Sequence, residues 1–97
     1  MSDNNIIIYS KKECPYCIKA KDLLKTLNLE YNEIILDPSN ENYKETVDEL
    51  KQKYNHYTFP FIIVNDIFLG GFKELDNANN TLYLQTILNI NIDDFDF

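Results

Sequence analysis

The 97-residue sequence is poor in several residue types on which many functional sites depend. It contains no arginine and no tryptophan, one histidine, two glycines and two cysteines. The formal net charge is −7, and together with the missing arginine this charge argues against nucleic acid as a partner. One histidine without a second pair of cysteines argues against a tetrahedral zinc site, which needs about four ligands.

Long apolar runs and targeting features are missing as well. No stretch approaches the roughly 20 apolar residues that cross a bilayer, and residues 1–5 have neither a basic region nor a cleavage motif. We therefore expect a soluble cytoplasmic protein with no membrane partner, in a compartment that keeps exposed thiols reduced. The length fits a single domain over residues 1–97, and no feature of the sequence requires more than a monomer.

Positive charge is concentrated in the first quarter of the chain. Residues 1–27 hold five lysines against three acids, a net charge of +2, whereas the remainder holds four lysines against thirteen acids, a net charge of −9. Both cysteines lie in this basic segment. An exposed lysine-rich helix face and a role in steering a ligand explain the distribution about equally well.

The pattern of apolar residues predicts strands and helices in the order βαβ, helix, β-hairpin, helix. Short apolar runs predict buried strands at residues 6–9 and 33–36 and two further strands at residues 61–64 and 67–69. Apolar residues at helical spacing predict a helix that ends near Asn28 and another that ends near Asn55. The pair Asn65-Asp66 predicts a two-residue hairpin between the last two strands.

The last helical region is expected to begin at residues 72–76. Residues 76–80 are a poor helix interior, so a break is expected there before Leu82, Ile87 and Leu88 resume the apolar pattern. The whole order predicts an α/β fold, in which a four-stranded mixed β-sheet is flanked by helices on both faces. The acidic segment 93–97 has no obvious place in the core and forms a possible short tail.

The two cysteines form the segment Cys14-Pro15-Tyr16-Cys17, between the first strand and the first helix. A bridge between them would close almost no loop and would stabilise the fold little. Proline suits the first helical position, and the N–H groups of Tyr16 and Cys17 would then point toward the Cys14 sulfur. Thiol pKa values at helix N-termini fall from about 8.5 to roughly 3.5–7.5, so we expect Cys14 to be ionised at neutral pH.

The different depths of the two cysteines predict different roles. Cys14 attacks a substrate disulfide, and Cys17, one turn inside the helix, resolves the mixed disulfide. Lys11 and Lys12, just ahead of the helix, favour the thiolate further. On spacing alone a structural pair of buried thiols stays open, but the βαβ context favours redox chemistry. The sole histidine, His56, is expected to be a solvated loop residue.

The sequence resembles the glutaredoxins over about residues 5–90. Besides Cys14-Pro15-Tyr16-Cys17, the resemblance rests on Lys11, on Thr58-Phe59-Pro60 before the hairpin and on Gly70-Gly71 after it. It implies a thioredoxin-like fold and a glutathione-dependent thiol–disulfide oxidoreductase. Thioredoxins proper are less similar, since they carry Trp-Cys-Gly-Pro-Cys and this sequence has no tryptophan.

The resemblance also implies a glutathione site around the dithiol. Lys11 would pair with the glycine carboxylate, and the backbone of Phe59, before a cis proline, would pair with the cysteinyl part. The helix after Gly71 would offer N–H groups to the γ-glutamyl carboxylate, and Glu74 would meet the ammonium group. With Cys14 and Cys17 catalytic and no metal expected, the implied glutathione-binding residues are Lys11, Tyr16, Thr58, Phe59, Pro60, Gly71, Lys73 and Glu74.

Three residues depart from the family's pattern. Phe59 replaces the usual valine, and its ring narrows the groove. Tyr57 occupies a position that is often basic or amide-bearing, so Gln52 and Lys53 are candidates to bind the carboxylate in its place. Lys73 replaces a small or acidic residue and adds positive charge near the γ-glutamyl carboxylate.

The function that the resemblance implies is reduction of disulfide-containing and glutathionylated proteins. One alternative is a glutaredoxin-like electron donor to ribonucleotide reductase that is reduced by thioredoxin reductase. Another is a dimeric iron–sulfur carrier, although proline after the first cysteine resembles members that mostly do not hold clusters. Residues 93–97 look somewhat like the peptide by which the small subunit of ribonucleotide reductase docks on the large one, and a frayed solvated end is the alternative.

Overall fold

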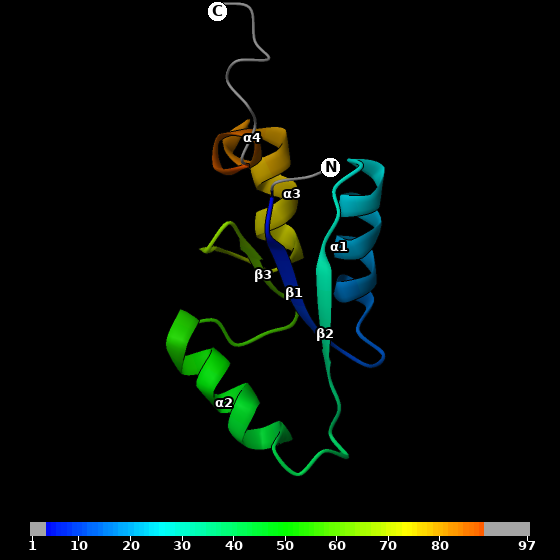
Figure 1. The fold of residues 1–97 in the computed structure, drawn as a ribbon, viewed down its shortest axis with the longest axis vertical. Helices are drawn as coiled ribbons and strands as arrows, with labels where there is room; N and C mark the ends of the chain where they lie inside the picture. Colours follow the sequence, from blue (N-terminus) through cyan, green and yellow to red (C-terminus); the bar gives the residue numbers. More distant parts are fainter. Residues whose placement is uncertain (1–3, 89–97) are drawn as a thin grey trace, which may run out of the picture.

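The computed structural model describes residues 4–88, which form a four-stranded sheet and four helices (Figure 1). The elements are β1 (Ile6–Lys11), α1 (Pro15–Thr26), β2 (Asn32–Leu36), α2 (Tyr43–Tyr54), β3 (Phe61–Val64), β4 (Ile67–Gly70), α3 (Phe72–Asn80) and α4 (Tyr83–Ile87). The strand order is β2-β1-β3-β4, in which β1 and β2 are parallel and β3 is antiparallel to both of its neighbours. The predicted mixed sheet is therefore confirmed, whereas the segment 93–97 lies outside the described residues.

The main core lies between one face of the sheet and helices α1, α3 and α4. Alternation along the strands places Ile6 and Ile8 of β1, and Ile62 and Val64 of β3, on this face. The helices contribute Ala20, Leu24, Leu75, Ala78, Leu84 and Ile87. Each buried leucine or isoleucine contributes roughly 1.5–3 kcal/mol, so this cluster fixes α1 and α3 against the same face. Helix α2 lies on the other side of the strands (Figure 1).

The backbone at the predicted turns confirms them. Asn65 and Asp66 have φ angles of 50° and 68°, and positive values at both central positions are those of a type I′ hairpin turn. Asn28 and Asn55, with φ angles of 63° and 51°, follow the ends of α1 and α2. Asparagine tolerates the left-handed region because its short side chain bonds locally, which is why it stops a helix well.

The apolar run at residues 33–36 forms an edge strand, so the prediction of a buried strand there is wrong. Among the described strands β2 pairs only with β1, and Ile34 and Ile35 are 40% and 55% exposed. A short apolar run looks the same in a central strand and in an edge strand. Whether a strand lies at the centre or at the edge of a sheet depends on the connections between the strands. The four residues of the apolar run carry no information about these connections.

Helix α3 runs without interruption through the segment in which the sequence predicts a break. It continues to Asn80, because Leu75 and Ala78 are buried and their packing outweighs the weak helix propensity of the asparagines. The chain turns instead at Leu82, which has a φ angle of 68° and is 65% exposed. The apolar pattern therefore resumes at Leu84 and not at Leu82.

Candidate active site

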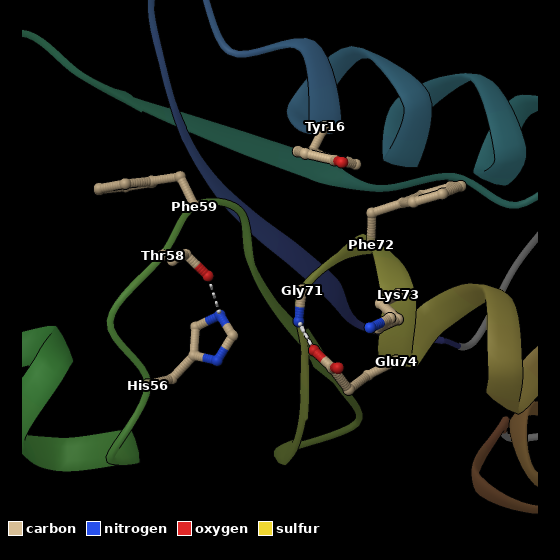
Figure 2. Close-up of a pocket in the computed structure, with 8 residues that line it drawn as sticks. All are labelled: Tyr16, His56, Thr58, Phe59, Gly71, Phe72, Lys73 and Glu74. Carbon is tan, nitrogen blue, oxygen red and sulfur yellow. Dashed lines mark hydrogen bonds between the residues drawn. The ribbon is translucent and has the colours of Figure 1, made fainter.

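One hollow of about 440 Å³ lies between the segment that precedes β3 and the first turn of α3 (Figure 2). It is lined by Tyr16, His56, Thr58, Phe59, Gly71, Phe72, Lys73 and Glu74. Apart from His56 and Phe72, every lining residue belongs to the site that the sequence predicts. Tyr16 brings the start of α1 to this hollow, where its ring stacks on that of Phe72 at 6.3 Å between centroids.

A second hollow of about 360 Å³ opens beside the dithiol. It is lined by Lys11, Glu13, Cys14, Pro15, Tyr16, Tyr43, Val47, Lys51, Tyr57, Thr58 and Phe59. The two hollows share Tyr16, Thr58 and Phe59, so they adjoin, and together they are called the groove below.

Of the predicted binding residues, Pro60 alone lines neither hollow, because its side chain is buried. The Phe59–Pro60 peptide bond is cis, as the resemblance implies. The carbonyl oxygen of Pro60 lies 3.5 Å from the position that a Cβ atom would take on Gly71, so the two backbones pack closely.

Two glycines shape the entrance to α3. Gly70 has a φ angle of 126°, and a Cβ atom there would lie 2.6 Å from Oε1 of Glu74. That same Oε1 accepts a hydrogen bond from the backbone N–H of Gly71 at 2.7 Å (Figure 2). Glu74 therefore caps the first turn of α3 with one carboxylate oxygen, a role that the sequence reasoning did not assign to it.

Lys51 is a groove residue that sequence reasoning missed. The sequence suggests Gln52 or Lys53 near Tyr57, but neither lines the groove, and the ammonium of Lys53 lies 5.2 Å from the centre of the Tyr54 ring. Tyr43, Val47 and Lys51 are spaced by four residues, so one face of α2 carries all three. That spacing is visible in the sequence and could have indicated Lys51.

His56 also lines the groove; it lies in a loop, as expected, but it is half-buried rather than fully solvated. Its ring packs in a T-shaped geometry with those of Phe61 and Phe68, with centroids 5.0 Å and 5.3 Å away. Its Nε2 lies 3.5 Å from Oγ1 of Thr58 (Figure 2). A lone histidine in a loop carries no sequence signal for such packing, which depends on how the loop folds over β3 and β4.

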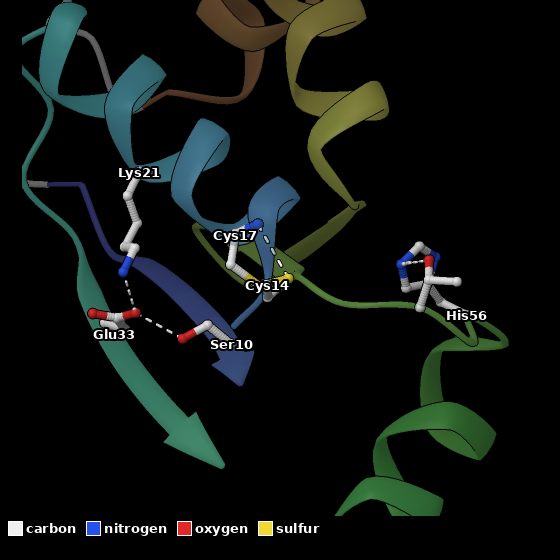
Figure 3. The surroundings of a disulfide bond; sticks show 7 residues. Ser10, Cys14, Cys17, Lys21, Glu33 and His56 are labelled. Atoms are coloured by element: carbon white, nitrogen blue, oxygen red, sulfur yellow. Dashed lines mark hydrogen bonds and ion pairs between the residues drawn. A yellow bond between two sulfur atoms is a disulfide. The ribbon is translucent and has the colours of Figure 1, made fainter. Parts of the chain in front are cut away.

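Cys14 and Cys17 are joined by a disulfide at the N-terminus of α1 (Figure 3). Their Cα atoms are 5.2 Å apart, within the range that a disulfide needs. Cys14 is the N-cap, Pro15 follows at the first helical position, and the Cys14 sulfur accepts a hydrogen bond from the Cys17 N–H at 3.2 Å. The predicted N-cap and the bond from Cys17 are therefore confirmed, and this donor would stabilise a thiolate on Cys14.

The two sulfurs differ in access. Cys14 is 6% exposed and lines the groove, whereas Cys17 is 2% exposed and lines neither hollow. A substrate in the groove therefore meets Cys14 first, and Cys17 is placed to attack the Cys14 sulfur once that sulfur carries a mixed disulfide.

Glu33 ties together three elements behind the dithiol (Figure 3). Its Oε2 accepts a hydrogen bond from the buried hydroxyl of Ser10 at 2.7 Å and lies 2.8 Å from the Lys21 ammonium. These contacts join β1, β2 and α1 near the strand end that leads into the dithiol. The hydrogen bond from Lys21, with help from that of Ser10, lowers the pKa of Glu33 below its ordinary value despite partial burial.

Glu33→Gln is expected to lower the free energy of unfolding by about 1 kcal/mol at neutral pH, the usual net worth of one such bond. Because the pKa is lower in the folded state, this stabilisation is complete above the unfolded value near 4.5 and is lost as the pH falls through the folded pKa. Urea unfolding at neutral pH and again between about pH 4 and pH 3 measures both effects.

The matched control is Glu30→Gln, an exposed position just before β2. It should leave stability unchanged at every pH. A Glu33→Gln protein as stable as the unaltered one at neutral pH would show that the Ser10–Glu33–Lys21 contacts contribute nothing.

Comparison with known proteins assigns the chain to a family. The glutaredoxin family model matches residues 6–69. The chain belongs to the glutaredoxin family. This glutaredoxin is 36% identical to Glutaredoxin 1 of Rickettsia prowazekii over 85 residues, which are 88% of this chain and 87% of that one. The solution structure of glutaredoxin from Brucella melitensis is 31% identical, with a TM-score of 0.71 and 87% of each chain covered.

The fold of the glutaredoxin agrees with that of more distant relatives. A crystal structure described as a buckwheat glutaredoxin–glutathione complex has a TM-score of 0.80 at 23% identity, covering 90% of this chain and 78% of that one. The predicted thioredoxin-like fold is thereby confirmed. Membership of the family and the Cys14–Cys17 pair make this glutaredoxin a thiol–disulfide oxidoreductase. The family match ends before Gly71, and the glutathione-binding roles of all the predicted site residues stay predictions.

Two further properties concern residues 4–88 of the glutaredoxin. No three histidine, cysteine, aspartate or glutamate side chains in that range lie together as metal ligands would. No helix in the same range is both long and apolar enough to cross a membrane.

Proposed function

We propose that this glutaredoxin takes electrons from glutathione and reduces protein disulfides and protein–glutathione mixed disulfides. The charge pattern along the groove is the observation that carries this proposal. Lys11 and Lys51 lie in the hollow beside Cys14, and Lys73 and Glu74 lie in the other, at the start of α3. Glutathione has a carboxylate at each end and an ammonium group beside one of them, so its charges complement the groove.

In the proposed pose glutathione crosses the groove with its sulfur at Cys14. Its glycine carboxylate meets Lys11 and Lys51, and its cysteinyl part runs along the backbone of Phe59 as an added strand would. The γ-glutamyl carboxylate meets the first turn of α3 and Lys73, and the ammonium group meets the Glu74 carboxylate. The Tyr57 hydroxyl donates a hydrogen bond to Asn55 at 2.9 Å. In this pose Lys51, and not Tyr57, supplies the second positive charge to the glycine carboxylate.

The reduction of a protein disulfide needs four thiolate displacements, two by the cysteines of the protein and two by molecules of glutathione. The Cys14 thiolate attacks one sulfur of the substrate disulfide, forms a mixed disulfide and releases the other sulfur as a thiolate. The Cys17 thiolate then attacks the Cys14 sulfur and releases the rest of the substrate, which leaves the disulfide seen in the structure. One glutathione opens this disulfide and a second removes the first as oxidised glutathione, so two electrons pass to the substrate.

An assay of NADPH consumption with two alternative electron sources tests the proposal. The substrate is the mixed disulfide of glutathione and 2-mercaptoethanol, and the protein is supplied first with glutathione and glutathione reductase, then with thioredoxin reductase alone. We expect turnover only with glutathione. Turnover only with thioredoxin reductase would overturn the proposal and favour the donor to ribonucleotide reductase, since Tyr57 and Phe59 would then have closed the groove to glutathione.

We also propose that the protein acts as a monomer in the cytoplasm, where glutathione keeps thiols reduced. Rapid loss of function when the protein is directed to an oxidising compartment would agree with this placement. Full activity there would contradict it.

A further inference from the structure

Two unpaired ammonium groups face the hollow beside Cys14. Elsewhere in residues 4–88, Lys12 lies 3.2 Å from a carboxylate oxygen of Asp37, and Lys21 is paired with Glu33. Within the same range neither Lys11 nor Lys51 forms an ion pair, and both line this hollow. Other lysines of the described range also lack an ion pair, but none of them lines this hollow, so Lys11 and Lys51 are the cations beside the reactive sulfur.

Aromatic and aliphatic side chains line this hollow together with the two lysines. The Lys11 ammonium lies 5.4 Å from the centre of the Phe59 ring, a distance at which the ring face attracts a cation. Lys51 is half-buried on the α2 face that also carries Tyr43 and Val47. Lys11 is exposed, so added salt should screen its attraction for a carboxylate. Among the described residues that line it, Glu13 is the one acid.

A protein substrate would place more than a terminal carboxylate in this space. In the proposed pose the residue that follows the glutathione cysteine is glycine, whose carboxylate reaches Lys11 and Lys51. A protein chain continues past that residue, so no terminal carboxylate is available there. The hollow of about 360 Å³ has room for a side chain instead, and a side-chain carboxylate restores the missing charge.

We infer that this hollow selects protein disulfides in which the attacked cysteine is followed by aspartate or glutamate. The inference rests on the proposed glutathione pose for the direction of the substrate chain. The Cys14 thiolate attacks the cysteine that precedes the acidic residue, and the partner sulfur leaves as a thiolate. Cys17 then releases the acidic segment as a free thiol, so no electron source beyond the reduced dithiol is needed.

Single-turnover reduction of short peptide disulfides tests this selection. The substrates are disulfide homodimers of acetyl-Gly-Cys-X-Gly-amide in which X is aspartate, asparagine or lysine, and the reductant is the pre-reduced protein. Each rate is divided by the rate at which dithiothreitol reduces the same peptide, which corrects for the effect of X on thiol reactivity. At low ionic strength we expect the aspartate peptide to react about tenfold faster than the lysine peptide.

Two variants separate the hollow from the general charge of the protein. Lys51→Gln should lower the aspartate-to-lysine ratio to about twofold, since one of the two cations is gone. Lys44→Gln removes an equal charge from an exposed position of α2 that lines neither hollow, and it should leave the ratio unchanged. Added salt should reduce the ratio in the unaltered protein.

Three results would overturn the inference: equal corrected rates for all three peptides, a ratio that Lys51→Gln leaves unchanged, or an equal preference for aspartate placed before the cysteine. The peptide assay contains no glutathione, so it is independent of the NADPH-coupled assay. If the protein is inactive with glutathione in the NADPH-coupled assay but still prefers the aspartate peptide, only the proposed reductant is overturned. If it is active with glutathione but reduces all three peptides at equal corrected rates, only this inference is overturned.

Discussion

Cys14→Ser is expected to abolish disulfide reduction, with a rate at least about 1,000-fold lower, which corresponds to about 4 kcal/mol of lost transition-state stabilisation. The serine hydroxyl stays protonated at neutral pH and cannot form the mixed disulfide. Cys17 cannot take over, because it is buried and lines neither hollow of the groove. Single-turnover reduction of a peptide disulfide measures the loss directly.

The control for this variant is the reduced, unaltered protein. Serine has nearly the shape of cysteine, and its oxygen can still accept the bond from the Cys17 N–H, so the thermal unfolding midpoints of the two should agree. A residual rate above a few per cent of the unaltered one would show that another group attacks the substrate.

Cys17→Ser is expected to separate the two reactions that this glutaredoxin is proposed to catalyse. Reduction of protein disulfides should fall by roughly a hundredfold or more, because no thiol is left to attack the Cys14 sulfur from inside the helix. Reduction of glutathione mixed disulfides should stay within about twofold, because glutathione from solution can open the bond between Cys14 and glutathione. The NADPH-coupled assay with each kind of substrate measures the ratio.

Mass spectrometry without reducing agent supplies the second readout for Cys17→Ser. The stable mixed disulfide of Cys14 with a peptide substrate should accumulate in this variant and be absent from Cys14→Ser. An equal loss of both activities would contradict the assigned roles, since Cys17 would then be needed before the resolving step.

The local parts of the fold were predictable because their causes are local. The Asn65-Asp66 turn, the ends of α1 and α2 at asparagines, and the dithiol at a helix N-terminus all depend on a few neighbouring residues. The uninterrupted α3 and the exposed β2 were not predictable in the same way. Burial of Leu75 and the position of β2 at the sheet edge follow from how distant elements pack.

The predicted site shows the same division. Lys11, Thr58, Phe59 and Gly71 are spaced as in the family, and the structure brings them to one groove. Lys51 and His56 belong to no motif. Their place in the groove depends on the rotation of α2 about its axis and on the path of the loop before Thr58. A short stretch of sequence predicts neither of these features.

The exposed edge of the sheet affects how readily separate molecules of the protein associate. Outer strands with uncovered apolar residues, such as Ile34 and Ile35 on β2, are templates on which a second copy can add a strand. Mutual repulsion between copies that each carry a net charge of −7 opposes this contact. Near the isoelectric point of about 4.5 the repulsion disappears. Acid therefore removes the one long-range force that keeps the open edges of separate molecules apart.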